Sequence, residues 1–151
     1  MSNRIVNRKA PKKGADFYET PRDAILKLIE NESFDGGISE PACGKGAISR
    51  VMIEKGYRVN SSDLFSYGYG KPGVDFLVSK KKVDNLITNP PFNLALEFTK
   101  QATSLTMRKV ALLMRIQFLE GKERGEFFKH TPPRESMSSA KESLVTKRRL
   151  T

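Results

Sequence analysis

Asn89-Pro90-Pro91-Phe92 follows the apolar run Leu86-Ile87-Thr88 and precedes a segment with helical periodicity. Proline donates no backbone hydrogen bond and holds the residue before it in extended geometry, so the strand must end here in a rigid corner. Such a corner directs the Asn89 side-chain amide and the Pro90 carbonyl into one small space, with the Phe92 ring beside them. Two acceptors and an aromatic face suit an exocyclic amino group on a planar base. The simpler alternative is a turn without chemistry, because Asn and Pro are common turn residues.

A glycine-containing loop lies upstream of this corner. A short strand over residues 38–40 leads into Pro41-Ala42-Cys43-Gly44-Lys45-Gly46, and a helix is expected from residue 47 to about 55. This order of elements presents backbone N–H groups and a positive helix end to a ligand. A Walker phosphate loop is excluded, because Ser39 and Gly46 stand where that motif needs a glycine and a Ser or Thr. A dinucleotide fingerprint is weakened by Ser49, which replaces its third glycine.

The remaining elements complete an α/β pattern. A strand over residues 57–63 ends in Asp63, where nucleotide-binding folds place a carboxylate for ribose hydroxyls. A helix to about residue 106 and a buried strand over 109–115 follow the corner. We therefore predict a Rossmann-like, doubly wound α/β sheet. Ligands bind such sheets at the carboxyl ends of the strands, so Glu40, Asp63 and Asn89 should converge on one cleft.

These motifs together resemble those of the class I S-adenosylmethionine-dependent amino-methyltransferases, in particular the phage and prophage type of DNA N6-adenine methyltransferase. Asn89-Pro90-Pro91-Phe92 looks like the catalytic motif of that family, and residues 40–46 resemble its first cofactor motif. The resemblance implies S-adenosylmethionine as the cofactor, with Glu40 at its amino group, and requires no metal. The implied cofactor contacts are Phe17, Thr20, Pro21, Glu40, Ala42, Cys43, Gly44, Gly46, Asp63, Leu64, Asp75, Phe76 and Asn89, and the implied catalytic residues are Asn89, Pro90, Pro91 and Phe92.

Two of the implied contacts have a second interpretation. Thr20 is predicted as an N-cap and Pro21 as the first residue of a helix that runs to about residue 31. Family members place an aromatic-x-Thr-Pro stretch like this one beneath the methionine end of the cofactor. Good capping explains the two residues without any ligand, so both roles stay open.

Length and composition limit the class of protein. The 151 residues are enough for one domain, and one Cys and one His exclude a disulfide framework and a structural zinc site. The low cysteine content points to a reducing compartment, and with the resemblance we expect the cytoplasm of a bacterial or phage-infected cell. No apolar run approaches the length of a membrane span, so we expect no membrane partner.

The net charge of +10 is concentrated at the two ends of the chain. Residues 1–15 carry five Lys or Arg and no acid, and residues 129–151 carry six Lys or Arg against two acids. Basic arms of this kind bind nucleic acid through counterion release, although they also serve as solvated termini. The lysine run at residues 80–82 either faces water or meets phosphate. We expect a nucleic-acid partner, with DNA favoured and RNA as the alternative.

The family pattern breaks near the C-terminus. We assign residues 16–133 to the methyltransferase domain and expect 1–15 and 134–151 to be disordered basic segments. Residues 135–143 are polar and show no strand character, so the antiparallel hairpin that completes the sheet in the family is expected to be missing. Suitable codons for this stretch, read one nucleotide earlier, would encode a strand-like segment. We therefore hypothesise a shift in reading frame near residue 135.

The expected reaction is methyl transfer to an exocyclic amino group, most simply adenine N6 in DNA. RNA bases and protein glutamine are alternative substrates, and a non-catalytic nucleic-acid-binding remnant is an alternative of a different class. A helix over residues 118–128 resembles a variable element of the family. Its residues Arg124, Phe127 and Phe128 would lie near the substrate or in the core.

Overall fold

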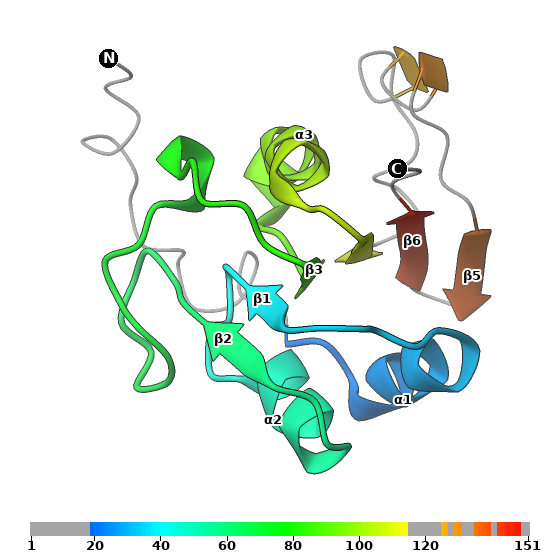
Figure 1. Cartoon of the computed structure of the whole chain (residues 1–151), viewed down its shortest axis with the longest axis horizontal. Coiled ribbons are helices and arrows are strands. Elements are labelled where there is room, and N and C mark those ends of the chain that lie inside the picture. Colours follow the sequence, from blue (N-terminus) through cyan, green and yellow to red (C-terminus); the bar gives the residue numbers. More distant parts are fainter. Residues whose placement is uncertain (1–18, 115–124, 127–128, 131–134, 140–141, 149–151) are drawn as a thin grey trace.

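The computed structural model describes residues 19–114, 125–126, 129–130, 135–139 and 142–148, and its centre is a six-stranded sheet (Figure 1). The strand order is β2-β1-β3-β4-β6-β5. The first four strands are parallel, β6 is antiparallel to β4, and β5 is antiparallel to β6. The bounds are β1 Ile38–Glu40, β2 Val59–Ser61, β3 Asn85–Thr88, β4 Lys109–Met114, β5 Glu135–Ser139 and β6 Glu142–Arg148.

Helices cover both faces of the parallel strands (Figure 1). The helices α1 (Arg22–Asn31) and α2 (Ala47–Glu54) lie on one face, and α3 (Ala95–Leu105) lies on the other. Along β4, Ala111 and Leu113 join the core under α1 and α2, whereas Val110, Leu112 and Met114 join the core under α3. Burial on both faces is typical of a parallel strand between two helical layers. The predicted doubly wound α/β fold is therefore confirmed.

Most predicted elements occur close to their expected positions. The helix expected from residue 47 is α2, and the buried strand expected over 109–115 is β4. A short 3-10 turn, η3 (Phe92–Leu94), comes between the proline corner and α3, and another, η2 (Phe76–Val78), lies between β2 and β3. β2 begins two residues later than predicted. The Tyr57 N–H donates to the Met52 carbonyl, so Tyr57 is part of the turn that follows α2.

The predicted start of the first helix is wrong by one residue. Pro21 is the N-cap, with φ −61° and ψ 145°, and the helix begins at Arg22 without a side-chain cap. The extended Pro21 moves Thr20 one position too far from the first turn for its hydroxyl to reach the N–H groups there. Thr20 therefore has no capping role.

The expectation of a missing C-terminal hairpin is also wrong. β5 and β6 pair with each other, and β6 pairs with β4 from Lys109↔Arg148 to Met114↔Ser143. The polar stretch 135–143 carries weak strand propensity, but β4 offers a row of backbone donors and acceptors that is a ready template for another strand. These non-local bonds outweigh local propensity. The frameshift hypothesis concerns the gene, and resequencing it would test that idea.

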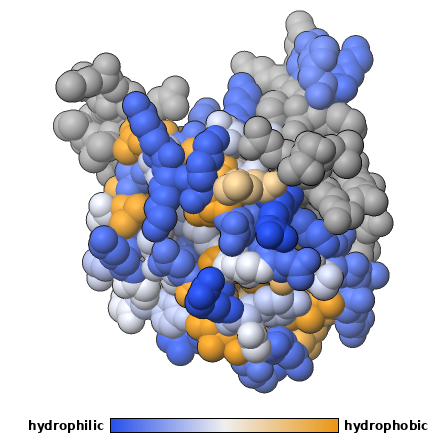
Figure 2. Space-filling model, in the orientation of Figure 1, coloured by the Kyte–Doolittle hydropathy of each residue, from blue (hydrophilic) through white to orange (hydrophobic). Residues whose placement is uncertain are grey.

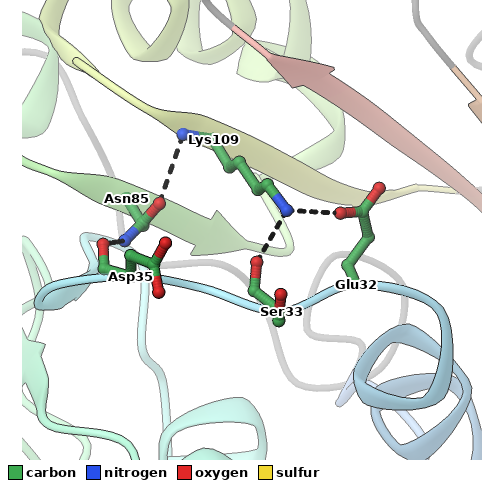
Figure 3. A network of polar contacts seen from close by, with 5 residues as sticks. All are labelled: Glu32, Ser33, Asp35, Asn85 and Lys109. Carbon is green, nitrogen blue, oxygen red and sulfur yellow. Dashed lines mark hydrogen bonds and ion pairs between the residues drawn. The ribbon is translucent and has the colours of Figure 1, made fainter.

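A polar network ties the amino-terminal ends of β3 and β4 to the loop after α1 (Figure 3). Asn85 is fully buried, and its Nδ2 donates to the Asp35 carbonyl at 2.7 Å while its Oδ1 accepts from the Lys109 N–H at 3.2 Å. Lys109 Nζ donates to Glu32 at 2.7 Å and to the Ser33 carbonyl at 2.7 Å. The network lies at the opposite end of the strands from the glycine loop and the corner, so it holds the sheet without touching them.

Candidate active site

The strand order places the predicted motifs beside one another. The chain passes from β1 to β2 on one side and then crosses to β3 on the other side of β1. The point between β1 and β3 where the direction reverses is where ligands bind in open α/β sheets. Glu40 ends β1, Thr88 ends β3 immediately before the corner, and Asp63 follows β2. The predicted convergence of the three strand ends follows from this topology.

Glu40 is the most unusual acid in the described structure. Its side chain is 1% exposed, and its Oε2 accepts from the Ala42 N–H at 3.4 Å. Burial raises the pKa of Glu40 to about 8. The nearby Thr88 hydroxyl and the Ala42 N–H lower this pKa without offsetting burial, and the charge of Asp63 raises it further. A buried carboxyl of this kind favours a cation as its partner, because a nearby positive charge would restore its ionised form.

Asp63 holds the glycine loop against the end of β2. Its Oδ2 accepts from the Gly44 N–H at 3.0 Å, and its Oδ1 accepts from the Phe65 N–H at 3.0 Å. Each carboxylate oxygen has a second lone pair, so Asp63 can also accept hydrogen bonds from the hydroxyl groups of a ligand. Leu64 next to it is half-buried, and its carbonyl accepts from Gly73.

The expectation that the glycine loop offers N–H groups to a ligand is wrong for four of its residues. The N–H groups of Ala42, Cys43, Gly44 and Gly46 donate to Glu40, Ser62, Asp63 and the Cys43 carbonyl, respectively. A phosphate-binding loop keeps such donors available, so this loop is unsuited to that role.

Sequence reasoning missed Tyr69, which packs on the glycine loop. A Cβ added at Gly46 would lie 2.8 Å from the Tyr69 ring, and Gly46 has a φ of +88° that L-residues rarely adopt. The Arg50 guanidinium lies 4.5 Å from the centre of the same ring. The alternating Gly and Tyr residues at 67–70 were the only signal, and they are also ordinary loop composition.

Cys43 lies under the same loop as a neutral thiol. Its side chain is 5% exposed, and its Sγ lies 3.6 Å from the Tyr69 carbonyl. Burial, followed by the charges of Glu40 and Asp63, raises the pKa of the Cys43 thiol to about 12. Cys43 therefore packs against the loop and does not act as a nucleophile.

Thr20 carries a buried hydroxyl whose hydrogen-bond partner is missing from the described part of the chain. The residue is 6% exposed, and its Oγ1 makes no hydrogen bond there. A buried hydroxyl without a partner is unfavourable by about 1–3 kcal/mol, which a ligand can offset. Pro21 is exposed, and Phe17 lies outside the described residues.

The predicted adenine contacts lie at the start of η2. Asp75 is 8% exposed, and its Oδ1 accepts from the Leu77 N–H at 3.0 Å. Phe76 is 6% exposed and packs against Phe98 with 5.2 Å between ring centres. Gln101 was not predicted, yet its Nε2 donates to the carbonyls of Phe76 and Ser79 and so fixes η2 on α3.

The proline corner has the rigid form that its sequence predicts. Pro90 is buried and Asn89 is half-buried, while Pro91 is extended, with φ −53° and ψ 132°. The Leu94 N–H donates to the Pro91 carbonyl at 3.0 Å and closes η3. Phe92 is 51% exposed at the start of this turn, so its ring has surface available for stacking.

Comparisons with known proteins identify the fold. No protein-family model and no curated protein sequence matches the chain. A proposed RNA methyltransferase from Pyrococcus horikoshii superposes with a TM-score of 0.72 at 14% identity, covering 98% of this chain and 95% of that chain. A 23S rRNA methyltransferase gives 0.64 at 12% identity, with 89% and 70% covered. Magnesium protoporphyrin IX methyltransferase from Synechocystis PCC 6803 with bound S-adenosylmethionine gives 0.61 at 16% identity, with 85% and 77% covered. At such identities the similarity establishes the class I methyltransferase fold.

Two further features of the described residues bear on partners. They contain no group of three or more His, Cys, Asp or Glu side chains arranged to hold a metal ion. Among the same residues, no helix has the length and apolar character needed to cross a membrane.

Proposed function

We propose that this protein is an S-adenosylmethionine-dependent methyltransferase that acts on adenine N6 in DNA, in the cytoplasm of a bacterial or phage-infected cell. The observation that carries the proposal is the position of a buried carboxyl, Glu40, at the end of β1, next to β3, whose end leads into the Asn89-Pro90-Pro91-Phe92 corner. A cation site beside a set of amino-group acceptors is what methyl transfer from a sulfonium to an amine requires.

The cofactor would be held by residues from three strand ends. Glu40 would meet its ammonium group, and Asp63 would accept from its ribose hydroxyls through lone pairs that the Gly44 and Phe65 N–H groups leave available. The Thr20 hydroxyl would gain a partner at the methionine end, and Asp75 would accept from the adenine amino group. When bound, S-adenosylmethionine supplies an electrophilic methyl group on its sulfonium.

The corner would prepare the acceptor nitrogen. The lone pair of an adenine amino group is delocalised into the ring, which makes the nitrogen a poor nucleophile. The two N–H groups of the amino nitrogen would donate to the Asn89 side-chain oxygen and to the Pro90 carbonyl. These hydrogen bonds favour the pyramidal form of the nitrogen and stabilise the positive charge that develops on it. The exposed Phe92 ring would hold the extruded base by stacking.

The test is transfer of labelled methyl from S-adenosylmethionine to unmethylated duplex DNA, followed by digestion to nucleosides. We expect label in N6-methyladenine. Removal of the acceptor in Asn89→Ala should lower the rate by about 100-fold or more, a typical loss for one preorganised transition-state hydrogen bond. Asn93→Ala is the matched control, because Asn93 is exposed on η3 four residues further on and should keep wild-type activity.

Other outcomes would replace parts of the proposal. Label found only in RNA or in protein glutamine would keep the reaction and change the substrate. DNA binding without transfer in the wild type, unchanged by Asn89→Ala, would identify a non-catalytic binding protein. Equal losses in the Asn89 and Asn93 variants would remove the assigned role of Asn89.

A further inference from the structure

A run of three consecutive lysines lies on one of the two helical faces of the sheet. On one face, α1 has two basic and two acidic side chains, and α2 has one of each, so both helices are neutral. On the other face, Glu97 and Lys100 balance within α3, but the run Lys80-Lys81-Lys82 adds three positive charges. Figure 2 shows hydrophilic side chains gathered over the η2 region, next to hydrophobic surface. The lysine run therefore lies on the face of α3, the helix that follows the proline corner and η3.

The lysine run is fixed on α3 at both ends. Before it, the Ser79 carbonyl accepts from Gln101 Nε2 at 2.6 Å, and the Ser79 hydroxyl accepts from the Lys81 N–H at 3.3 Å. After it, the Val83 N–H donates to the Leu105 carbonyl at 3.1 Å. A segment held in this way loses little conformational entropy when it binds a ligand.

The lysines of this face divide into two groups. Lys82 Nζ donates to the Ser104 carbonyl at 3.0 Å near the C-terminal end of α3, where a positive charge stabilises the helix. Lys80 and Lys81 are exposed, and Lys100 is exposed one helical turn before Ser104, the residue that Lys82 contacts. These three ammonium groups form the lysine patch.

The lysine patch lies at a suitable distance from the corner. Gln101 is six residues beyond the start of α3, which corresponds to about 9 Å along the helix axis. Successive phosphates of one strand in duplex DNA are about 3.4 Å apart along the axis, so the patch is about three phosphates from η3. We propose that Lys80, Lys81 and Lys100 bind the backbone phosphates of the strand whose base enters at Phe92, an inference that rests on the proposed function.

Salt-dependent binding tests this assignment on the full chain. The probe is a fluorescein-labelled 20-base-pair duplex, and the variant Lys80→Ala/Lys81→Ala is compared with Lys27→Ala/Lys55→Ala, which removes two exposed lysines from the opposite face. Loss of two phosphate contacts should reduce the slope of log K against log salt by about 1.8 and weaken binding about tenfold or more at moderate salt. The Lys27/Lys55 variant should match the wild type, and S-adenosylmethionine should bind all three proteins equally.

The outcomes separate this inference from the proposed function. Equal slopes for the two double variants would overturn the lysine patch, whether or not methyl transfer occurs. Patch-dependent binding without transfer to any nucleic acid would support the patch and overturn the proposed reaction. Repeating the titration with single-stranded RNA of the same sequence identifies the source of the phosphate. A larger loss of binding to the duplex in Lys80→Ala/Lys81→Ala would show that the lysine patch binds DNA. A larger loss of binding to the RNA would show that it binds RNA.

Discussion

Glu40 and Asp63 follow neighbouring parallel strands, yet their surroundings differ. The register pairs Glu40 with Ser61, only two residues before Asp63. Glu40 is 1% exposed, with a pKa raised to about 8, and its Oε2 accepts a long hydrogen bond of 3.4 Å from the Ala42 N–H. Asp63 is half-buried, and each of its oxygens accepts an N–H group at 3.0 Å. Asp63 thus contributes to loop structure without a ligand, whereas Glu40 lacks a positive partner among the contacts that the structure gives it.

The largest expected effect is on cofactor affinity in Glu40→Gln. This change keeps the shape of the side chain and removes the charge that would pair with a bound ammonium. Loss of one partner from a buried ion pair costs about 3–5 kcal/mol, so S-adenosylmethionine should bind at least about 100-fold more weakly by calorimetry. The exposed Glu30→Gln is the control and should bind as the wild type does. An unchanged affinity in Glu40→Gln would mean that the buried acid is only a structural residue.

The next expected effect is on the pH dependence of folding. The pKa of Glu40 is about 8 in the folded protein and 4.5 in its ordinary state, so the folded chain holds the extra proton between these values. The contribution of Glu40 should therefore lower the free energy of unfolding as pH rises from about 4.5 to about 8, by up to about 1.4 kcal/mol per pH unit. Urea unfolding of the cofactor-free protein should show a shallower decline in Glu40→Gln. Parallel profiles for the two proteins would contradict the buried, protonated state.

The smallest effects are expected for Asp63→Asn, and they test whether the two acids are coupled. An amide retains one good acceptor, so either Gly44 or Phe65 loses its partner, which should lower the free energy of unfolding by about 1–2 kcal/mol in urea. Removal of the Asp63 charge should also lower the pKa of Glu40 slightly, because that charge is the last of the causes that set it. An unchanged pH profile would show that the two carboxyls do not interact.

Much of the architecture was predictable because its signals are local. The helix periodicity of residues 47–54, the apolar run of β4 and the proline corner after β3 each depend on neighbouring residues only. The capping assignment of Thr20 failed because one extended residue, Pro21, separates it from the helix. The hairpin was missed because β6 pairs with β4 between residues 29 or more positions apart, and β5 in turn pairs with β6.

The same distinction applies to the candidate site. The residue types of the site and their spacing are properties of the sequence alone. They comprise an acid and glycines at the end of one strand, an acid after the next strand, and Asn-Pro-Pro-Phe after the third. The burial of Glu40, the use of the loop N–H groups by Ser62 and Asp63, and the contact of Tyr69 with Gly46 arise when distant segments meet. Desolvation and hydrogen-bond competition depend on what surrounds a group in space. The sequence therefore determines which functional groups the candidate site contains, whereas the tertiary structure determines their protonation and hydrogen bonding.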